Sequence, residues 1–304
     1  MKYALIDMGS NTIRMVIYAT EGTTFDTLFS KKYMAGLAGY VQEGRMTAEG
    51  IEKACDVLRA CKSLLSQFDI TETVLFATAS LRDISNTQEV VDLIFLRTGY
   101  RVNVISGHEE AFLDYFGVMH GISLEKGVLV DIGGGSTEIA TFAADGPAYM
   151  ESIPIGSLRL YTEMVSKFLP REAETERIQE RVQRELKKVK LEKLPHYDVV
   201  CGVGGTARAL LQLIQEQDKL PADNRSFTID QFRQMKKLLL KRDETAKKLI
   251  LRVCPDRVHT IVPGMLILDI ILKKLHSKTI YVSQYGVREG YLLRHCLKHA
   301  DTVD

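Results

Sequence analysis

The chain has 304 residues, of which 45% are hydrophobic and 26% charged, and its formal net charge is +1. This composition is typical of a globular protein, and the length is enough for two domains that each bury a core. The longest apolar run, residues 261–272, contains a proline and an aspartate and is too short to cross a bilayer. Five cysteines without a C-x-x-C pair indicate reduced thiols. With no export signal in the sequence, we expect a cytoplasmic protein.

Charge is unevenly distributed along the chain. Residues 1–122 carry 11 Lys and Arg against 15 Asp and Glu, whereas the remainder carries 29 against 24. The basic excess lies in predicted helices, such as residues 184–193 and 233–252. Such faces are usually solvated, but a polyanionic ligand would gain salt-sensitive affinity from them.

A strand–turn–strand pattern opens the chain. The apolar residues 3–6 lead into Asp7, a turn of small residues follows, and residues 13–18 read as a second strand. Consecutive backbone N–H groups in such a turn form a concavity that suits an anion, and hydroxyl groups add donors. The turn that contains Ser10, Asn11 and Thr12 is therefore a candidate anion-binding loop.

The next segment reads as the rest of an open α/β sheet. Residues 24–33 form a strand, Thr47 caps a helix to about Phe68, and residues 73–77 form a buried strand. Arg82 follows the end of that strand, where such sheets place their ligand contacts. Asn86 and Glu89 predict a capping box for a helix ending at Thr98.

Two neighbouring acids begin the following helix. Ser106 as N-cap makes Glu109 the capping-box partner and leaves Glu110 without a local role. Glu110 is then either a general base or a solvated first-turn acid stabilised by the helix dipole. The local sequence leaves both readings open.

The opening pattern returns in the second half. A strand ends in Asp131, and Glu138 begins the next one; between them lie Gly133, Gly134, Gly135, Ser136 and Thr137. Three adjacent glycines cost too much chain entropy for a hairpin without a ligand, and the flanking acids suit a divalent cation. The repetition predicts two related α/β halves facing each other across a cleft. We place the domains at residues 1–122 and 123–304, and a last helix from about residue 286 can pack back on the first domain.

A third glycine turn lies further along. A strand over residues 197–201 ends in Gly204 and Gly205, which open a helix. A helix N-terminus of this kind can bind a phosphate, although the turn lacks the spacing of a dinucleotide fingerprint. Thr228 and Gln231 predict a further capping box.

Taken together, these segments resemble the exopolyphosphatase/guanosine pentaphosphate phosphohydrolase (Ppx/GppA) family in its short, two-domain form. That family belongs to the actin/Hsp70/sugar-kinase superfamily, whose domains are ribonuclease H-like. The segments that carry the resemblance are residues 7–12, 77–86, 105–111, 131–138, 202–207, 263–264 and 287–290.

The resemblance implies a phosphohydrolase that uses Mg²⁺, or alternatively Mn²⁺. It would release terminal phosphate from inorganic polyphosphate, the 5′-γ-phosphate of guanosine pentaphosphate, or both. It also implies that Glu110 is the general base and that Asp7, Asp131 and Glu138 bind the metal. The phosphate-binding positions of the family match Ser10 to Thr12 and Gly133 to Thr137, with Arg82 as a further contact.

The ligand would be polyphosphate or guanosine penta- or tetraphosphate, with no nucleic-acid or membrane partner and a homodimer as a candidate assembly. Compared with the family, the chain lacks the C-terminal helical domain of long members and has His259 where relatives usually have Asp. A non-catalytic polyphosphate or guanosine tetraphosphate sensor and a phosphotransferase of the same superfamily are the alternative functions.

Overall fold

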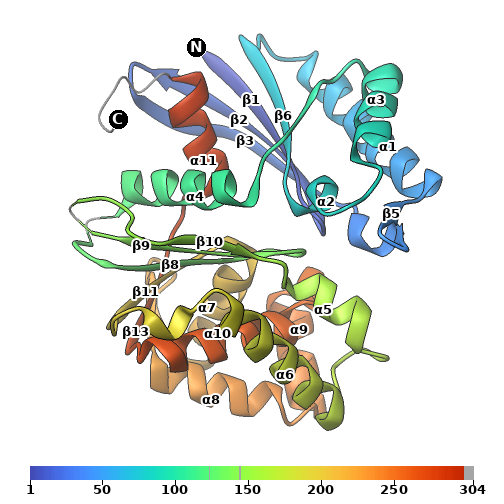
Figure 1. The fold of residues 1–304 in the computed structure, drawn as a ribbon. Coiled ribbons are helices and arrows are strands. Elements are labelled where there is room, and N and C mark those ends of the chain that lie inside the picture. Colours follow the sequence, from blue (N-terminus) through green and yellow to red (C-terminus); the bar gives the residue numbers. More distant parts are fainter. Residues whose placement is uncertain (123, 144, 298–304) are drawn as a thin grey trace. The chain divides into compact units, whose positions relative to one another are not determined.

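The computed structural model describes residues 1–122, 124–143 and 145–297. It forms two compact units (Figure 1), one of residues 1–117 with the segment from Val287 onward and one of Val118–Gly286. The domain limits expected from the sequence, 1–122 and 123–304, stay a prediction. No helix in the described part of the chain is long and apolar enough to span a membrane.

The first unit contains a five-stranded mixed sheet. Strands β1, β2 and β3 are consecutive and antiparallel, and β6 and then β7 continue the sheet parallel to β1. A small hairpin, β4–β5, lies outside this sheet. The strands are β1 (Lys2–Met8), β2 (Thr12–Glu21), β3 (Thr24–Met34), β4 (Val41–Gln42), β5 (Arg45–Met46), β6 (Glu72–Ala77) and β7 (Val102–Val104).

Alternation along β1 builds a core on each face of this sheet, because successive strand residues point to opposite sides. Ala4, Ile6 and Met8 join a cluster with residues of α1 and α3. Tyr3 and Leu5 join a second cluster with residues of α4 and α11 on the other side (Figure 1). The helices of this unit are α1 (Ala48–Leu65), α2 (Ala79–Arg82), α3 (Thr87–Thr98), α4 (Gly107–Gly121), α11 (Val287–Tyr291) and a π-helix (Leu292–Cys296), with a 3-10 turn at Leu37–Tyr40.

The second unit repeats the strand order of the first. β10, β9 and β8 are antiparallel neighbours, β11 and β13 continue parallel to β8, and β12 adds an antiparallel edge. The two matching sheets confirm the predicted α/β fold of two related actin-like halves. The strands are β8 (Gly127–Ile132), β9 (Thr137–Phe142), β10 (Met150–Ile153), β11 (Val199–Val203), β12 (Ser226–Thr228) and β13 (Thr279–Val282).

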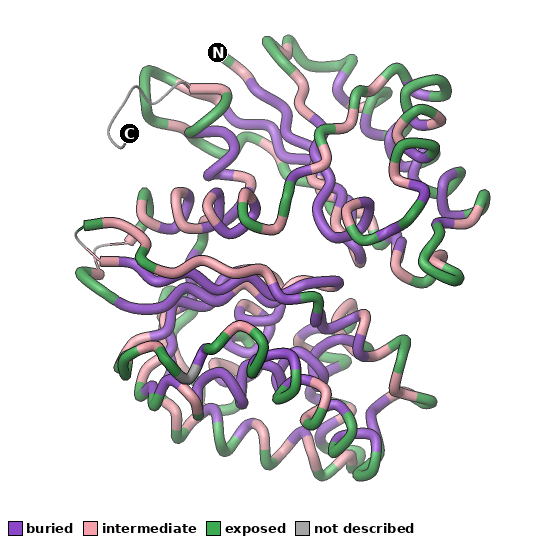
Figure 2. The backbone as a smooth tube through the Cα atoms, in the orientation of Figure 1, coloured by how far each residue is buried: buried purple, intermediate pink, exposed green. Residues whose placement is uncertain are grey.

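Helices of the second unit share one large core with its sheet, in which the central strands β8, β9 and β11 are almost continuously buried (Figure 2). α10 lies at the centre of this core and carries one buried acid, Asp269, which pairs with Lys236 at 2.7 Å and Lys273 at 2.8 Å. The helices are α5 (Ser157–Met164), α6 (Glu172–Lys188), α7 (Gly204–Asp218), α8 (Ile229–Leu239), α9 (Glu244–Val253) and α10 (Ile261–Leu275), with 3-10 turns at Leu191–Lys193 and Pro255–Arg257.

Three predicted helix caps are confirmed. The side chain of Thr47 accepts from Gly50 N, Ser106 Oγ accepts from Glu109 N, and Thr228 with Gln231 forms a full capping box.

The capping box predicted for Asn86 and Glu89 is wrong. The Asn86 side chain makes no cap bond to the helix backbone. Instead its Oδ1 accepts from Met46 N and its Nδ2 donates to Met46 O. The pairing with Met46 therefore replaces the cap, and the two predicted capping residues keep only a side-chain contact, from Asn86 Nδ2 to Glu89 Oε2 at 3.3 Å.

We expect the cysteine thiols of the folded protein to react slowly with iodoacetamide. Burial raises the pKa of Cys61 to about 11 and that of Cys254 to about 12. Because the thiolate is the nucleophile, both thiols stay protonated and unreactive at pH 8. Mass spectrometry after timed alkylation should show fast labelling of both residues only in denaturant. Labelling at the same rate in the native protein would contradict this expectation.

Candidate active site

The first hairpin turn is held by backbone hydrogen bonds and leaves one polar group without a partner. Gly9 N donates to Thr12 O at 3.0 Å, and the carbonyls of Ser10 and Asn11 accept from residues 36–38. The Asn11 side-chain Nδ2 is buried and has no hydrogen-bond partner. A buried donor left unpaired costs about 1–3 kcal/mol. A phosphate oxygen at this turn would satisfy it.

Asp7, at the end of β1, is paired with a residue from the other end of the chain. Arg288 Nη1 on α11 donates to Asp7 Oδ2 at 2.9 Å, and both side chains are 15% exposed. Burial raises the pKa of Asp7, and the charge and hydrogen bond of Arg288 oppose that shift. Among the described hydrogen bonds, the one to the Asp7 carboxylate is made by Oδ2.

A second contact fixes the same C-terminal segment on the sheet. Tyr18 of β2 donates its hydroxyl hydrogen to Glu289 Oε1, which is adjacent in sequence to Arg288. Burial, and next the charge of Glu289, raise the pKa of Tyr18 well above its usual value. In the same segment, the ring of Tyr291 stacks on that of Phe76 of β6, with a distance of 4.8 Å between the ring centroids. Arg288 is therefore held rigidly where it meets Asp7.

The structure brings together Glu110 and Arg82. Arg82 Nη1 donates to Glu110 Oε2 at 2.6 Å, with side-chain exposures of 18% and 11%. Arg82 ends the short helix α2 after β6, and Glu110 lies in the first turn of α4, so neighbouring strand ends position both. Since Glu110 is largely buried and paired, it is not a solvated first-turn acid. The guanidinium therefore orients the carboxylate.

The second hairpin turn is held by the N-terminus of α5. Ser157 N donates to Gly133 O, and the backbone N–H groups of Leu158 and Arg159 both donate to Gly134 O. Gly156 makes this approach possible, because a Cβ there would lie 2.3 Å from the carbonyl carbon and oxygen of Gly134. The glycine turn therefore has a fixed conformation, and Gly156, which was not among the predicted site residues, sets it.

We expect Gly156→Ala to lower both stability and phosphate release. The added methyl group would overlap the Gly134 backbone, which cannot move as a flexible side chain would, and such overpacking typically costs about 1–3 kcal/mol. Gly39→Ala is the control, because a Cβ at Gly39 meets no atom within 4 Å. Thermal unfolding and phosphate release of both variants would test this. Equal behaviour of the two would show that the turn tolerates displacement.

Asp131 and Glu138 lie opposite each other across the second hairpin. They are paired in the antiparallel register of β8 and β9, so their side chains leave the same face of the sheet. Glu138 is 1% exposed and accepts a hydrogen bond from Ser152 Oγ at 2.7 Å. Like charges placed directly opposite are destabilising. A cation bound between these two acids would remove that repulsion.

The third glycine turn lies directly against the Asp131 carboxylate. Gly204 begins α7 with a φ of +77°, which favours glycine, and a Cβ there would lie 2.1 Å from Asp131 Oδ1. The Asp131 carboxylate therefore lies against the N-terminus of α7, where the helix dipole favours negative charge.

Arg257 is a site residue that the sequence did not identify. Its guanidinium lies over Gly205, where a Cβ would be 1.8 Å from Nη2. Burial lowers the pKa of Arg257, and the charges of Asp256 and then Asp131 oppose this. A buried guanidinium beside a glycine turn can bind a phosphate group. Nothing in the local sequence distinguishes this arginine from the surface arginines around it.

Not every predicted phosphate-binding residue has a side chain that can reach a phosphate. Thr137 is fully buried and donates its hydroxyl hydrogen to Ile155 O at 2.6 Å, which holds the hairpin to the segment before α5. Ser136 is 3% exposed. The ring of His259 lies near those of Tyr161 and Phe168, at centroid distances of 4.7 and 6.2 Å.

The residues present fit a divalent metal only in part. Within either unit, the described residues include no group of three or more His, Cys, Asp or Glu that could hold a metal ion. The facing carboxylates of Asp131 and Glu138 nevertheless supply the hard oxygen donors that Mg²⁺ prefers. Mg²⁺ commonly uses one or two carboxylates and completes its shell with water and substrate phosphates, so this pair suits it.

Comparison with known proteins agrees with this fold. The model of the Ppx/GppA phosphatase family matches residues 16–299. Exopolyphosphatase 1 of Mycobacterium tuberculosis is 25% identical over 99% of this chain and 90% of its own length. The structure of a Ppx/GppA family member from Aquifex aeolicus has a TM-score of 0.79 at 27% identity, covering 99% of both chains. An exopolyphosphatase structure from Cytophaga hutchinsonii has a TM-score of 0.86 at 24% identity, again covering 99% of both chains.

The fold defines a two-unit actin-like α/β protein. More particularly, the chain belongs to the Ppx/GppA phosphatase family and is a phosphohydrolase.

Proposed function

We propose that this phosphohydrolase releases terminal phosphate from inorganic polyphosphate and that guanosine pentaphosphate is a further substrate. The main support is a cluster of groups in the second unit. It contains the facing acids Asp131 and Glu138, the two glycine turns and Arg257. This cluster combines the anion-binding and cation-binding groups that transfer of a phosphoryl group requires. The exopolyphosphatase name of relatives that match almost the entire chain supports polyphosphate as the leading substrate.

In the first unit, Glu110 and the first hairpin turn would act on water and phosphate. We propose that Glu110 accepts a hydrogen bond from the attacking water and takes its proton, while Arg82 keeps the carboxylate oriented. Asn11, with its unpaired Nδ2, would donate to a phosphate oxygen, and the N–H and hydroxyl groups of Ser10 and Thr12 would add donors.

In the second unit, backbone N–H groups would bind phosphate at two places. We propose that the turn of residues 133–137 and the N-terminus of α7 at Gly204 and Gly205 donate to phosphoryl oxygens. Arg257 would neutralise part of the phosphoryl charge. Because a fixed turn requires no reorganisation during the reaction, the anchoring by α5 favours catalysis.

We propose Mg²⁺ as the metal and Asp7, Asp131 and Glu138 as its ligands, with Mn²⁺ able to replace it. When bound, the metal would neutralise charge on the phosphates and on the leaving oxygen. Removing the metal leaves the acids to repel a polyanionic substrate, so chelation by EDTA should abolish turnover, and added Mg²⁺ should restore it.

The test is phosphate release with Mg²⁺ from long polyphosphate, tripolyphosphate and guanosine pentaphosphate in parallel. Polyphosphate should give the fastest release, and Asp131→Asn should abolish it, whereas the exposed Asp198→Asn serves as a matched control. Release without an added acceptor excludes a phosphotransferase. Tight binding of all three compounds without release would overturn the proposal and favour a sensor.

A further inference from the structure

The α8–α9 segment of the second unit holds its main concentration of positive charge. Between Ile229 and Val253 the chain carries eight Lys or Arg against three Asp or Glu. This excess of five equals that of the whole chain from residue 123 onward, which carries 29 basic and 24 acidic residues. The basic character that the sequence shows in its second half is therefore concentrated on two consecutive helices.

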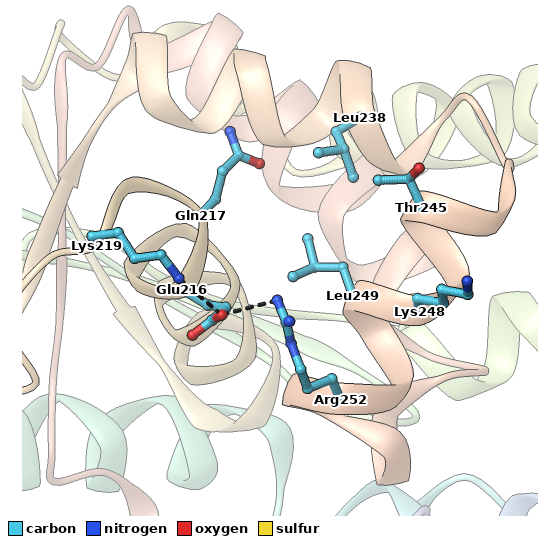
Figure 3. A pocket seen from close by; sticks show the side chains of 8 residues that line it. All are labelled: Glu216, Gln217, Lys219, Leu238, Thr245, Lys248, Leu249 and Arg252. Carbon is cyan, nitrogen blue, oxygen red and sulfur yellow. Dashed lines mark hydrogen bonds and ion pairs between the residues drawn. The ribbon is translucent and has the colours of Figure 1, made fainter.

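A groove lies where these helices meet α7. It has a volume of about 620 Å³, within the range of about 300–1,000 Å³ that is typical of small-molecule sites. One wall comes from α9, because positions 245, 248, 249 and 252 follow helical spacing and share one face. The C-terminal end of α7 and one residue of α8 complete the lining (Figure 3), which consists of Glu216, Gln217, Lys219, Leu238, Thr245, Lys248, Leu249 and Arg252.

The groove has more cations than its single acid can neutralise. Glu216 Oε1 accepts from Lys219 at 3.1 Å and from Arg252 at 2.9 Å, as Figure 3 shows. Lys248 adds a third cation from the same face of α9 as Arg252. Lys219 and Arg252 are 78% and 65% exposed, so an entering anion can reach both. Pairing with one carboxylate leaves this surface net positive.

The groove also has an apolar part. Leu238 of α8 and Leu249 of α9 lie side by side in its lining, and Gln217 and Thr245 supply an amide and a hydroxyl group (Figure 3). A bare phosphate chain gains nothing from contact with leucine, whereas the flat ring of a nucleobase would cover both side chains. An amide can in addition bind the polar edge of a base.

The groove is separate from the candidate active site of the same unit. α7 begins at Gly204 and ends at Asp218, beside the groove. A helix of 15 residues is about 20 Å long, so that distance separates its glycine turn from the groove. The groove lining contains none of the residues assigned above to catalysis, phosphate or metal.

We propose that the groove between α7, α8 and α9 is a second, non-catalytic binding site for a nucleoside polyphosphate. The base would lie on Leu238 and Leu249, and the phosphates would contact Lys219, Lys248 and Arg252. This site does not depend on the proposed substrate, because it shares no residue with the catalytic assignments.

Photo-crosslinking of the full chain with 8-azidoguanosine 5′-triphosphate, without added divalent cation, tests this proposal. Peptide mapping should find label within residues 216–219 or 238–252. Lys248→Glu and Arg252→Glu should each raise the concentration for half-maximal labelling there by about tenfold, since each removes a charge-assisted contact. Lys248→Gln and Arg252→Gln should give the same direction with a smaller effect.

Matched controls come from another basic groove of the same unit, between α6 and α10. Lys187→Glu and Lys274→Glu, which line that groove, make the same charge change and should leave the labelling unaltered. If they reduce it equally, net charge alone drives association and the site is wrong. Absence of label from both segments overturns the proposal as well.

Competition separates a nucleotide from a simple polyanion. Unmodified GTP should protect the groove from labelling at a concentration at least about tenfold lower than tripolyphosphate, because only GTP covers the leucines. Equal protection by tripolyphosphate would overturn the nucleotide assignment. Since labelling requires no turnover, its outcome is distinct from that of the phosphate-release assay.

Discussion

Replacing Glu110 by Gln is expected to lower the rate of phosphate release by about 10²–10⁴-fold, the usual contribution of a general base. The amide keeps the size of the side chain, and its oxygen can still accept the hydrogen bond from Arg82. It cannot take a proton from water. We therefore expect kcat to fall while binding of polyphosphate and the fold remain unchanged.

Glu109→Gln is a close control for this experiment. It makes the same chemical change one residue earlier in α4, on an acid that is not among the proposed catalytic groups. The kcat of this variant should stay within about threefold of the wild type. If Glu110→Gln also retains turnover at that level, the base has been assigned to the wrong residue.

Replacing Arg288 by Met is expected to destabilise the first unit by about 3–5 kcal/mol, because it leaves the buried Asp7 carboxylate without its counter-ion. Met has a similar length and cannot pair with Asp7. The double variant Asp7→Asn/Arg288→Met removes both charges and should recover much of the lost stability. Hydrogen exchange of the β1 amides measures the change in this unit without assuming that both units unfold together.

The pH dependence of the Arg288→Met variant follows from the same contact. Burial raises the pKa of Asp7 even beside Arg288, and loss of the guanidinium should raise it further. The folded state then binds more protons than the unfolded state between the two pKa values. The stability of this variant should therefore increase as the pH is lowered through the folded-state pKa towards the unfolded-state pKa.

An exposed ion pair serves as the control for Arg288. Arg45 pairs with Glu89 at 2.7 Å, but both side chains are more than half exposed. Arg45→Met should change stability by less than about 1 kcal/mol. A similarly small change for Arg288→Met would mean that the buried pair contributes little.

Features encoded by neighbouring residues were predictable from the sequence. Short apolar runs ending in Asp7 and Asp131 predicted the two hairpins, and the matching strand orders confirm that the halves are related. Ser106 was predicted to cap α4, and its hydroxyl oxygen does accept from the backbone N–H of Glu109. The sequence placed Arg82 and Glu110 after consecutive strands of the sheet, but the hydrogen bond between them was seen only in the structure.

Features that depend on distant residues were not predictable. Arg288 lies 281 positions from Asp7, and no local pattern shows that they meet. Asn86 has the spacing of a capping residue, yet its amide bonds the backbone of Met46, 40 positions away. Arg257 reaches the glycine turn of α7 only because the chain before α10 returns to that helix. Each required the tertiary arrangement of its unit.

The path of the chain has a consequence for synthesis on the ribosome. Val118–Gly286 is continuous, so the second unit can fold as soon as that stretch has emerged. The first unit is interrupted by it, and β1 receives Arg288 only when nearly the whole chain has been translated. Until then the nascent N-terminal sheet holds Asp7 and Tyr18 without their partners. The N-terminal unit, although made first, should therefore be the last to reach its native state and the one that relies most on chaperones.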